Sequence, residues 1–600
     1  MEVILQVFYS VFSGLMLALA IPNELYTFGA PVFTLIAFIP FYLCFYNAKS
    51  YAQAFRTGFI QAITAHLISS FWLAYFKDFA IFTLGASAVG TGFIGGFMGF
   101  IYYIPYSSTY SHNRLNEKAS YAPFYISPAF RIFYFASVYT IYEWVKSSGF
   151  LGYPWGTVSS AMFRWPVLMQ LSSITGTYGI TFLITLLNAI FAEAFIHWFK
   201  TLKEDRRYGQ REFSLNTSSF FYLVILAAVL LYGLVQYNIP RKAIKHFYAV
   251  LVQQNEDPWK QTSDDESILE SQRLTEEKLE ELKQENKKAD LIVWSEGVLT
   301  RSFPYGNYHY SKQPAERALI PFIKEKKVPL LAGGSYIKDS EKRKINNAAL
   351  MFDENGNFRG YYAKNHLVPF AEVIPFSDFP AISSFLKKVV GISAGWTPGD
   401  QYVFFDINAS PTENYRLPAV KNIDITKSFK EQQKEEKEGI KVKISTPICF
   451  DDAFTDIMRP LYMNGSEVFL NITDDSWSLK KSSEIQHFVI ASYRAIEYRT
   501  TLVRCANAGY SVVVDPAGKI ISDMPLFEKK ALAADIPVYK RRMTTYARFG
   551  NWLPYTLIIL FLLYMTYSIF TFVPDDYIPS ERKTKKKSKK RKSKNSKNKK

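Results

Sequence analysis

The sequence contains little cysteine and little histidine. Only 3 cysteines occur among 600 residues, which is too few for a disulfide framework. The 7 histidines form no His-Glu-x-x-His pair and no Cys/His cluster, the arrangements that commonly bind zinc. A phosphate-cradling glycine loop of the P-loop type is also missing. The sequence therefore predicts neither a disulfide scaffold, nor a metal site, nor a P-loop nucleotide-binding protein.

Acidic and aromatic residues are missing from the most basic segment. The stretch 582–600 carries 13 of the net 17 positive charges, and no acidic or aromatic residue interrupts it. Proteins that bind single-stranded nucleic acid stack the bases on aromatic side chains, so no nucleic-acid partner is predicted. A lysine block beside an apolar run instead indicates a disordered cytoplasmic tail, residues 575–600, close to anionic lipid.

Long apolar runs fill the first 240 residues and recur near the end of the chain. Eight runs are long enough to span a bilayer. They lie near residues 4–21, 31–47, 55–76, 80–105, 126–146, 174–198, 217–237 and 551–573. The segment before the first run contains Glu2 and no Lys or Arg, so we expect a retained span and not a signal peptide. The sequence thus predicts a membrane domain of seven spans, residues 1–240, and a final span within 549–574.

Two further features of these runs predict packing and orientation. In the fourth run, Gly92, Gly95, Gly96 and Gly99 have a spacing that permits close contact between helices. Connections rich in Lys and Arg alternate with poorer ones, and the positive-inside rule makes the rich set cytoplasmic. The rich connections lie beside Lys49, beside Arg114 and at 199–216, and the poor ones are 22–30, 77–79 and 147–173. Both termini are then cytoplasmic, and residues 241–548 lie on the outer side.

Residues 241–548 alternate short apolar strands with helices, which is typical of an α/β layered domain. The expected strands are 246–253, 291–294, 328–332, 442–448, 467–472, 501–505 and 511–514, and the expected helices are 265–288, 452–464 and 484–499. The stretch 407–441 is polar and rich in Lys and Glu, so it is predicted to be a surface insertion.

Three residues of this domain form a workable set for covalent acyl chemistry. Glu296 and Cys449 each follow an apolar strand, and Lys364 lies between them in the sequence. Sites in open α/β sheets form at the carboxyl ends of strands. A cation lowers the pKa of a neighbouring thiol and stabilises an oxyanion, and a carboxylate can accept the thiol proton. The alternative is that Glu296 and Lys364 form a surface ion pair and Cys449 is a core thiol, as is expected for Cys44 and Cys505.

Two other segments offer weaker motifs. Gly391-Ile-Ser393-Ala-Gly395 matches the serine nucleophile elbow, but a turn and not a helix follows it, which argues against a serine hydrolase. Residues 374–398 mix large apolar side chains with two lysines, and we expect a membrane-facing lid there that guides acyl chains, with Phe385 and Val389 on its apolar side.

With these residues identified, the chain resembles the apolipoprotein N-acyltransferases, the membrane members of the carbon–nitrogen hydrolase (nitrilase) superfamily. The resemblance covers nearly everything before the basic tail. In the membrane part it rests on Glu143-Trp144 and on Gly-Tyr-Pro-Trp-Gly at 152–156. In the second part it rests on 252–255 with Trp259, 293–296, 333–335, Asn347, 364–372, 448–449, 471–477 and the helix with Gln486-His487, Arg494 and Glu497.

The resemblance implies a fold, a reaction and partners. The fold is a nitrilase-like α-β-β-α sandwich outside the cytoplasmic membrane, joined to a polytopic helical domain of about eight spans. Glu296 would be the general base, Lys364 the transition-state stabiliser and Cys449 the nucleophile, with Glu372 supporting Lys364. Cys449 would take an acyl chain from a phospholipid and pass it, through a thioester, to the amino group of a diacylglyceryl-cysteine on an apolipoprotein. The resemblance further implies a monomer in the bacterial inner membrane that needs no cofactor.

The sequence departs from this family's pattern directly after the nucleophile. Where the family commonly has Tyr-Glu, this chain has Phe450-Asp451, which leaves the roles of these two positions open. Phe450, Asp451, Trp259 and Asn347 are retained as supporting residues of the predicted site.

Two other functions remain as alternatives. A membrane-anchored nitrilase-type amidase that hydrolyses a small amide would share the same triad, although one anchor would suffice for it. A transporter or scaffold with a degenerate outer domain would place ionisable residues within spans, and His66, Glu143 and Glu193 are the clearest candidates.

Overall fold

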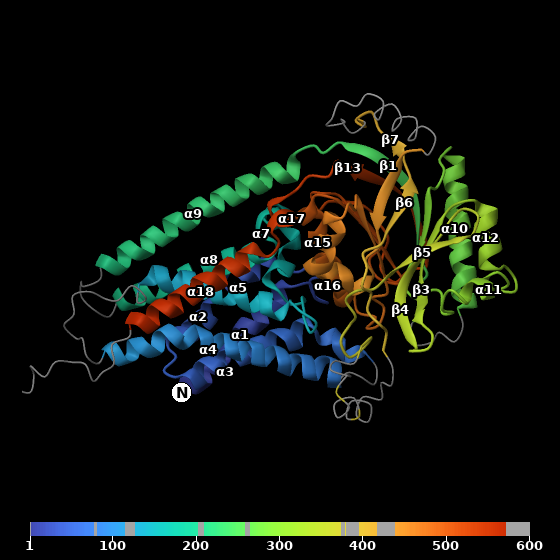
Figure 1. Cartoon of the computed structure of the whole chain (residues 1–600). Coiled ribbons are helices and arrows are strands. Elements are labelled where there is room, and N and C mark those ends of the chain that lie inside the picture. Colours follow the sequence, from blue (N-terminus) through green and yellow to red (C-terminus); the bar gives the residue numbers. More distant parts are fainter. Residues whose placement is uncertain are drawn as a thin grey trace, which may run out of the picture. The chain divides into compact units, whose positions relative to one another are not determined.

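The computed structural model of the chain describes residues 2–76, 81–113, 127–201, 209–257, 264–373, 379, 384, 395–416 and 439–571. Several predictions lie outside these residues: the role of Trp259, the Ser393 motif, the apolar side of the expected lid with Phe385 and Val389, and the basic tail. Residues 1–553 form one compact unit and 554–600 a second. The first unit, whose fold is shown in Figure 1, contains every predicted site residue that the structure describes.

Each predicted apolar run is occupied by helix. The described helices of this region are α1 (Glu2–Ala20), η1 (Pro31–Leu35), α2 (Ile39–Tyr46), α3 (Tyr51–Ser69), η2 (Phe71–Tyr75), η4 (Ile81–Ala86), α4 (Ser87–Asn113), α5 (Pro128–Lys146), η6 (Val158–Arg164), α6 (Pro166–Met169), α7 (Ser172–Thr175), α8 (Tyr178–Thr201), α9 (Gly209–Asn238) and, in the second unit for most of its length, α18 (Trp552–Thr571). Among the described residues, 4 helices are long and apolar enough to cross a membrane: Val3–Ala20, Thr83–Pro105, Tyr178–Phe199 and Ser214–Asn238. Pro31–Tyr46 and Trp552–Tyr567 are shorter apolar stretches. The count of eight spans and the orientation stay predictions.

The glycines of α4 allow an unusually close contact with α3. A Cβ atom added to Gly58 of α3 would lie 2.0 Å from the backbone oxygen of Gly95, and one added to Gly95 would lie 2.4 Å from Cβ of Ala62. Only glycine fits at such distances, so the predicted close packing along this face of α4 is confirmed.

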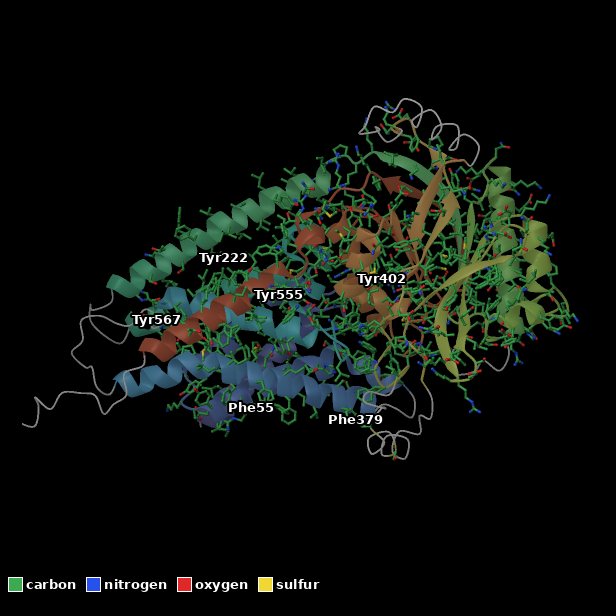
Figure 2. The ribbon with its side chains drawn as sticks, viewed as in Figure 1. Phe55, Tyr222, Phe379, Tyr402, Tyr555 and Tyr567 are labelled. Atoms are coloured by element: carbon green, nitrogen blue, oxygen red, sulfur yellow. The ribbon has the colours of Figure 1, made fainter. Side chains whose placement is uncertain are left out.

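Apolar side chains remain exposed on the helices, including Phe97 on α4 and Leu231 on α9. Figure 2 shows few oxygen or nitrogen atoms along the outer surface of the helical segments and many over the β-rich part. A surface of this kind suits a lipid environment.

Two buried carboxylates inside the helical region are paired with neighbouring donors. Arg131 of α5 donates to both carboxylate oxygens of Glu193 of α8, at 2.6 Å each. Glu143 accepts from the hydroxyl of Thr181 at 2.5 Å and from the backbone N–H of Val158 at 2.8 Å. Such closed pairs stabilise the packing of helices, and they give the transporter alternative no support.

The second part of the first unit contains two sheets. The first has the order β13-β1-β2-β3-β4-β5 with β7 beside β1, and the second has the order β12-β11-β10-β9-β8-β6. The strands are β1 (Ala243–Gln253), β2 (Leu291–Trp294), β3 (Leu330–Asp339), β4 (Lys344–Phe352), β5 (Phe358–Ala363), β6 (Phe404–Asn408), β7 (Ser410–Pro411), β8 (Lys441–Ser445), β9 (Val468–Thr473), β10 (Thr501–Ala506), β11 (Val512–Val514), β12 (Ile520–Asp523) and β13 (Lys530–Tyr539). Strands β6 to β8 therefore enter the predicted insertion at both of its ends, and its centre, 417–438, is not described.

Helices cover both outer faces of this pair of sheets, which gives the predicted α-β-β-α order (Figure 1). Helices α10 (Asp265–Gln284), α11 (Gly306–Tyr310) and α12 (Leu319–Lys326) lie on the first sheet, and α15 (Thr455–Met463) and α16 (Lys481–Tyr498) lie on the second. Alternate residues of β1 explain the layers: Val250 and Val252 pack in the cluster beneath α10 and α12, whereas the buried Leu251 points to the other side.

Helix α16 joins the β-rich part to the helical region. The side-chain amide of Gln486 donates to the backbone oxygens of Pro22 and Ser69, at 2.7 and 2.8 Å. Its oxygen accepts from the indole N–H of Trp72 at 3.2 Å. All these atoms are buried, so the helix is fixed on the connections that follow α1 and α3.

Candidate active site

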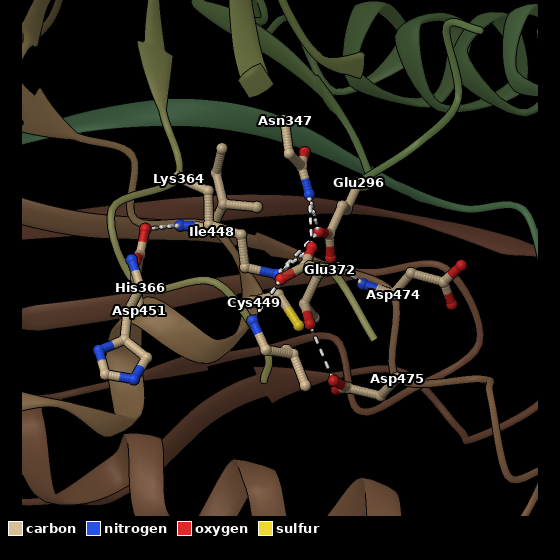
Figure 3. Close-up of polar contacts among 12 residues, drawn as sticks. Glu296, Asn347, Lys364, His366, Glu372, Ile448, Cys449, Asp451, Asp474 and Asp475 are labelled. Carbon is tan, nitrogen blue, oxygen red and sulfur yellow. Dashed lines mark hydrogen bonds and ion pairs between the residues drawn. The ribbon is translucent and has the colours of Figure 1, made fainter. Parts of the chain in front are cut away.

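The three predicted catalytic side chains come from separate elements and meet at one edge of the sandwich (Figure 3). Glu296 lies two residues beyond β2, Lys364 directly follows β5, and Cys449 begins the short helix η7 (Cys449–Ala453) beyond β8. Strand β2 is parallel to β1 and β3, and β8 is parallel to β9, so two of the three residues lie beyond the carboxyl ends of parallel strands, as the sequence indicated.

Lys364 is the centre of the charged group. Its Nζ lies 2.9 Å from Oε1 of Glu372 and 3.3 Å from Oε1 of Glu296, and its side chain is 1% exposed. The side-chain amide of Asn347, on β4, donates to the same two oxygens at 2.7 Å (Glu296) and 3.1 Å (Glu372). The second carboxylate oxygen of Glu372 accepts from the backbone N–H of Val368 at 2.7 Å. The structure therefore brings Glu372 and Asn347 to the triad, where they fix the lysine.

The backbone around Glu296 is held by a close approach of β3. A Cβ atom on Gly333 would lie 2.4 Å from the backbone oxygen of Ser295 and 2.4 Å from Cα of Glu296, so only glycine fits there. The second carboxylate oxygen of Glu296 accepts from the backbone N–H of Asp474 at 2.8 Å. Both contacts restrict the carboxylate to a single position.

Cys449 has a strained backbone, with φ at +46°. This left-handed conformation is costly for a residue with a side chain and is often found where a reactive group must be aimed. Its carbonyl accepts from the side-chain amide of Asn471 at 3.2 Å, and its side chain is partly exposed, unlike those of Cys44 and Cys505. Of the three cysteines, Cys449 is the one that a substrate can reach.

The electrostatic setting keeps Cys449 as a thiol at rest. Burial, followed by the negative charge of Glu296, raises the pKa of the Cys449 thiol well above its ordinary value, although Lys364 opposes this. Burial alone would lower the pKa of Lys364, but its anionic neighbours outweigh burial and raise that pKa well above the ordinary value. The site thus holds a permanent ammonium beside a protonated sulfur, which needs a base before it can attack.

Comparison with known proteins agrees with this geometry. Residues 13–190 match the apolipoprotein N-acyltransferase N-terminal domain, and residues 249–545 match the carbon-nitrogen hydrolase family. The chain is 36% identical over 571 residues to apolipoprotein N-acyltransferase 2 of Treponema denticola, covering 95% of this chain and 98% of that protein. The chain belongs to the apolipoprotein N-acyltransferase family.

A second Treponema relative supports the same family. The chain is 34% identical over 564 residues to apolipoprotein N-acyltransferase 2 of Treponema pallidum, covering 90% of this chain and 91% of that protein. Among solved structures, a carbon-nitrogen hydrolase from Helicobacter pylori covers 52% of this chain and 94% of its own, at 16% identity and a TM-score of 0.31. The expectation of a membrane acyltransferase with a carbon–nitrogen hydrolase domain is confirmed at the level of the family.

The two positions at which this member departs from the family's usual Tyr-Glu face away from each other. Asp451 accepts backbone N–H groups from Asn365 (3.1 Å) and His366 (2.7 Å), which directly follow Lys364. Phe450 stacks on Trp155 of the helical region, with ring centroids 5.1 Å apart and planes at 17°. Burial raises the pKa of the Asp451 carboxyl to about 7.

Four buried charged residues beside Cys449 were given no role from the sequence. They are Asp452 of η7, Asp475 beyond β9, His487 of α16 and Arg504 of β10. A ligand atom from each of Cys449, Asp475 and His487 lies within 4.8 Å of the others, a spacing that suits a metal ion, but both ring nitrogens of His487 already face aspartates. One signal was available: Arg504 interrupts an otherwise apolar strand, and a charge in a buried strand requires a buried partner.

Proposed function

We propose that the enzyme transfers an acyl chain from a membrane phospholipid, through a thioester on Cys449, to the α-amino group of diacylglyceryl-cysteine at the N-terminus of an apolipoprotein. The observation that carries this proposal is the strained, partly exposed Cys449 beside the Lys364 cluster, in a domain whose helix α16 is bonded into an apolar helical region. The names of the Treponema relatives support the acceptor class.

In the first half-reaction, the Cys449 thiol gives its proton to the Glu296 carboxylate as the sulfur attacks the carbonyl carbon of the phospholipid ester. The carbonyl oxygen becomes negative, and Lys364 stabilises it. The ester C–O bond then breaks, and the leaving oxygen takes the proton from Glu296. The products are a lysophospholipid and an acyl thioester.

In the second half-reaction, the neutral amine of the acceptor attacks the thioester carbonyl. Glu296 accepts the proton that the nitrogen loses, Lys364 again stabilises the oxyanion, and the C–S bond breaks with its electron pair on sulfur. The proton returns from Glu296 to sulfur, so the enzyme is regenerated and an amide has formed. Glu372 keeps the ammonium in place throughout, because its Oε1 lies 2.9 Å from Nζ.

The supporting residues have positioning roles in this proposal. Asp451 fixes the backbone beyond Lys364, Phe450 anchors the nucleophile turn on the helical region, and Asn347 orients both carboxylates. Trp259 remains a supporting residue by resemblance alone. We further propose that the chain works as a monomer in the bacterial inner membrane, with the catalytic domain on the outer side, and that it needs no cofactor.

The fixed junction between α16 and the helical region favours a lipid donor over a small soluble amide. A hydrolase of small amides has no need to bond a catalytic helix to the connections beyond α1 and α3. In the proposed reaction the same contact holds the nucleophile near the surface from which an acyl chain must enter.

The test is mass spectrometry of the detergent-purified enzyme after incubation with phosphatidylethanolamine and no acceptor. We expect an added acyl mass on the Cys449 peptide that hydroxylamine removes and that Cys449→Ala lacks. A diacylglyceryl-cysteine peptide with a free amine should then discharge it, and the N-acetylated peptide should not. Hydrolysis of simple amides with no acyl adduct from any phospholipid would instead establish the amidase alternative.

A further inference from the structure

The four charged residues beside Cys449 form a closed ring of ion pairs. The two ring nitrogens of His487 lie 2.5 Å from Oδ1 of Asp475 and 3.0 Å from Oδ1 of Asp452. Arg504 pairs with the remaining oxygen of each aspartate, at 3.0 Å for Asp475 and at a shorter distance for Asp452. The exposed fraction of each of the four is 8% or less.

The geometry fixes the protonation state of His487. Each ring nitrogen faces a carboxylate oxygen, and a neutral imidazole has only one N–H to donate, so both contacts are satisfied only by the imidazolium. Burial lowers the pKa of His487, but the charges of Asp475 and Asp452 outweigh burial, and the pKa is raised to about 9. The ring therefore carries two positive and two negative charges and is neutral as a whole.

The ring is attached to the nucleophile in two ways. Asp452 belongs to the same short helix, η7, that begins with Cys449. Ligand atoms of His487 and Asp475 also lie within 4.8 Å of the Cys449 sulfur. Lys364 and Arg504 also interact electrostatically with Cys449, so cations from separate parts of the fold surround the nucleophile.

We propose that His487 is a positioning residue for Cys449. His487 holds the nucleophile turn through Asp452, and its charge offsets the carboxylates near the sulfur when the sulfur becomes negative. The catalytic part of this proposal rests on the proposed function. In the second half-reaction the C–N bond forms, the C–S bond breaks and the electron pair goes to sulfur, while the amine proton passes to Glu296. At that moment the thiolate lies between Lys364 and His487.

Other ionisable groups face this pair. Those around Cys449 are Glu296, Lys364, Glu372 and Asp475, and those around the ring are Glu484 and Asp474. Burial, with Asp475 and Asp474, raises the pKa of Glu484 well above its ordinary value. Burial raises the pKa of Asp474 to about 7, and its titration is common to every variant compared below.

Two substitutions change the ring charge in opposite directions. His487→Gln leaves a net charge of −1, and Asp452→Asn leaves +1. An electrostatic role therefore predicts opposite shifts in the pKa of Cys449, upward in the first variant and downward in the second. A purely structural role predicts that both variants disturb the turn and change the thiol in the same way.

The experiment measures the rate at which iodoacetamide alkylates Cys449 at pH 7, where His487 is protonated, by peptide mass spectrometry on the full-length enzyme without lipid substrate. Below the pKa of the thiol this rate is proportional to the thiolate fraction, so we expect it to fall roughly tenfold in His487→Gln and to rise by a smaller factor in Asp452→Asn. The matched control is the half-exposed pair His246–Asp535, joined at 2.9 Å, in which His246→Gln and Asp535→Asn should leave the rate unchanged.

Shifts in the same direction, or no shift in either variant, would overturn the proposal. Size-exclusion elution and thermal unfolding report whether each variant folds. If His487→Gln does not fold, Arg504→Gln replaces it, because it also leaves the ring with a net charge of −1, and it must slow alkylation, opposite to Asp452→Asn. Because alkylation needs no lipid, opposite shifts together with no acyl adduct in the wild type would retain this inference and refute the proposed function.

Discussion

Replacing Asp451 by asparagine tests how Lys364 is held. Oδ1 of Asp451 accepts from the backbone N–H groups of Asn365 (3.1 Å) and His366 (2.7 Å), and Oδ2 accepts from the hydroxyl of Tyr362 (2.9 Å) and the N–H of Ile448 (3.1 Å). The carboxylate therefore joins the strand end that carries Lys364 to the turn that carries Cys449. An asparagine keeps one accepting oxygen, and its NH2 group can donate to the Tyr362 hydroxyl, but it opposes the backbone N–H of Ile448, which loses its acceptor.

The expected loss follows from that donor. A buried donor left without an acceptor costs about 1–3 kcal/mol, so Asp451→Asn should lower the free energy of unfolding by about that amount. A misplacement of about 1 Å at a reacting group reduces a rate by roughly 100-fold. We therefore expect thioester formation to slow by about 100-fold or more.

The assay is the single-turnover rate of acyl adduct formation on Cys449, measured with thermal unfolding under the same conditions. Tyr362→Phe is the graded control, because it removes one donor and leaves the carboxylate and its other three bonds in place. It should cost about 1 kcal/mol and less than about a tenfold loss of rate. An Asp451→Asn enzyme within about twofold of the wild type, or a Tyr362→Phe enzyme equally damaged, would refute the reasoning.

Three further predictions concern other parts of the molecule. The pKa of His487 is raised in the fold, so its contribution to stability, on the order of 3 kcal/mol, should be complete below pH 6.5 and lost as the pH rises through about 9. The free energies of unfolding of the wild type and His487→Gln should therefore converge across this range, and a difference that stays constant with pH would contradict the prediction. Gly333→Ala should abolish acyl transfer, because its Cβ would displace Glu296, and a normal rate would contradict the close approach at 2.4 Å. Gly95→Val should lower the melting temperature by separating α3 from α4, whereas Gly90→Ala, with open space around it, should not.

The sequence predicted the elements with simple patterns and missed those that depend on partners. Strand β2 (Leu291–Trp294) was predicted residue for residue, because a short, fully apolar run bounded by polar residues is typical of a buried parallel strand. Strands β4 and β5 were not predicted, since polar residues such as Asn346 and Arg359 interrupt their patterns. The position of Lys364 at a strand end was therefore not available from periodicity.

The ring around His487 was missed for a related reason. Its members come from η7, the segment beyond β9, α16 and β10, and only the parallel pairing of β8, β9 and β10 brings these segments together. A charged residue on a helix is normally interpreted as a solvated face. Burial on all sides, which changes that interpretation, depends on the covering helical region and cannot be inferred from local spacing.

The three residues after the nucleophile connect it to three different parts of the fold. Phe450 stacks on Trp155 of the helical region, Asp451 bonds the segment beyond Lys364, and Asp452 pairs with His487 and Arg504. A nucleophile held at φ +46° needs such support, because the strain of its backbone must be balanced by contacts outside the turn. The stacking of Phe450 on Trp155 comes from the helical region, so the orientation of Cys449 depends on that apolar region as well as on the catalytic domain. Loosening that contact should therefore impair acyl transfer even when the Glu296–Lys364–Glu372 group stays intact.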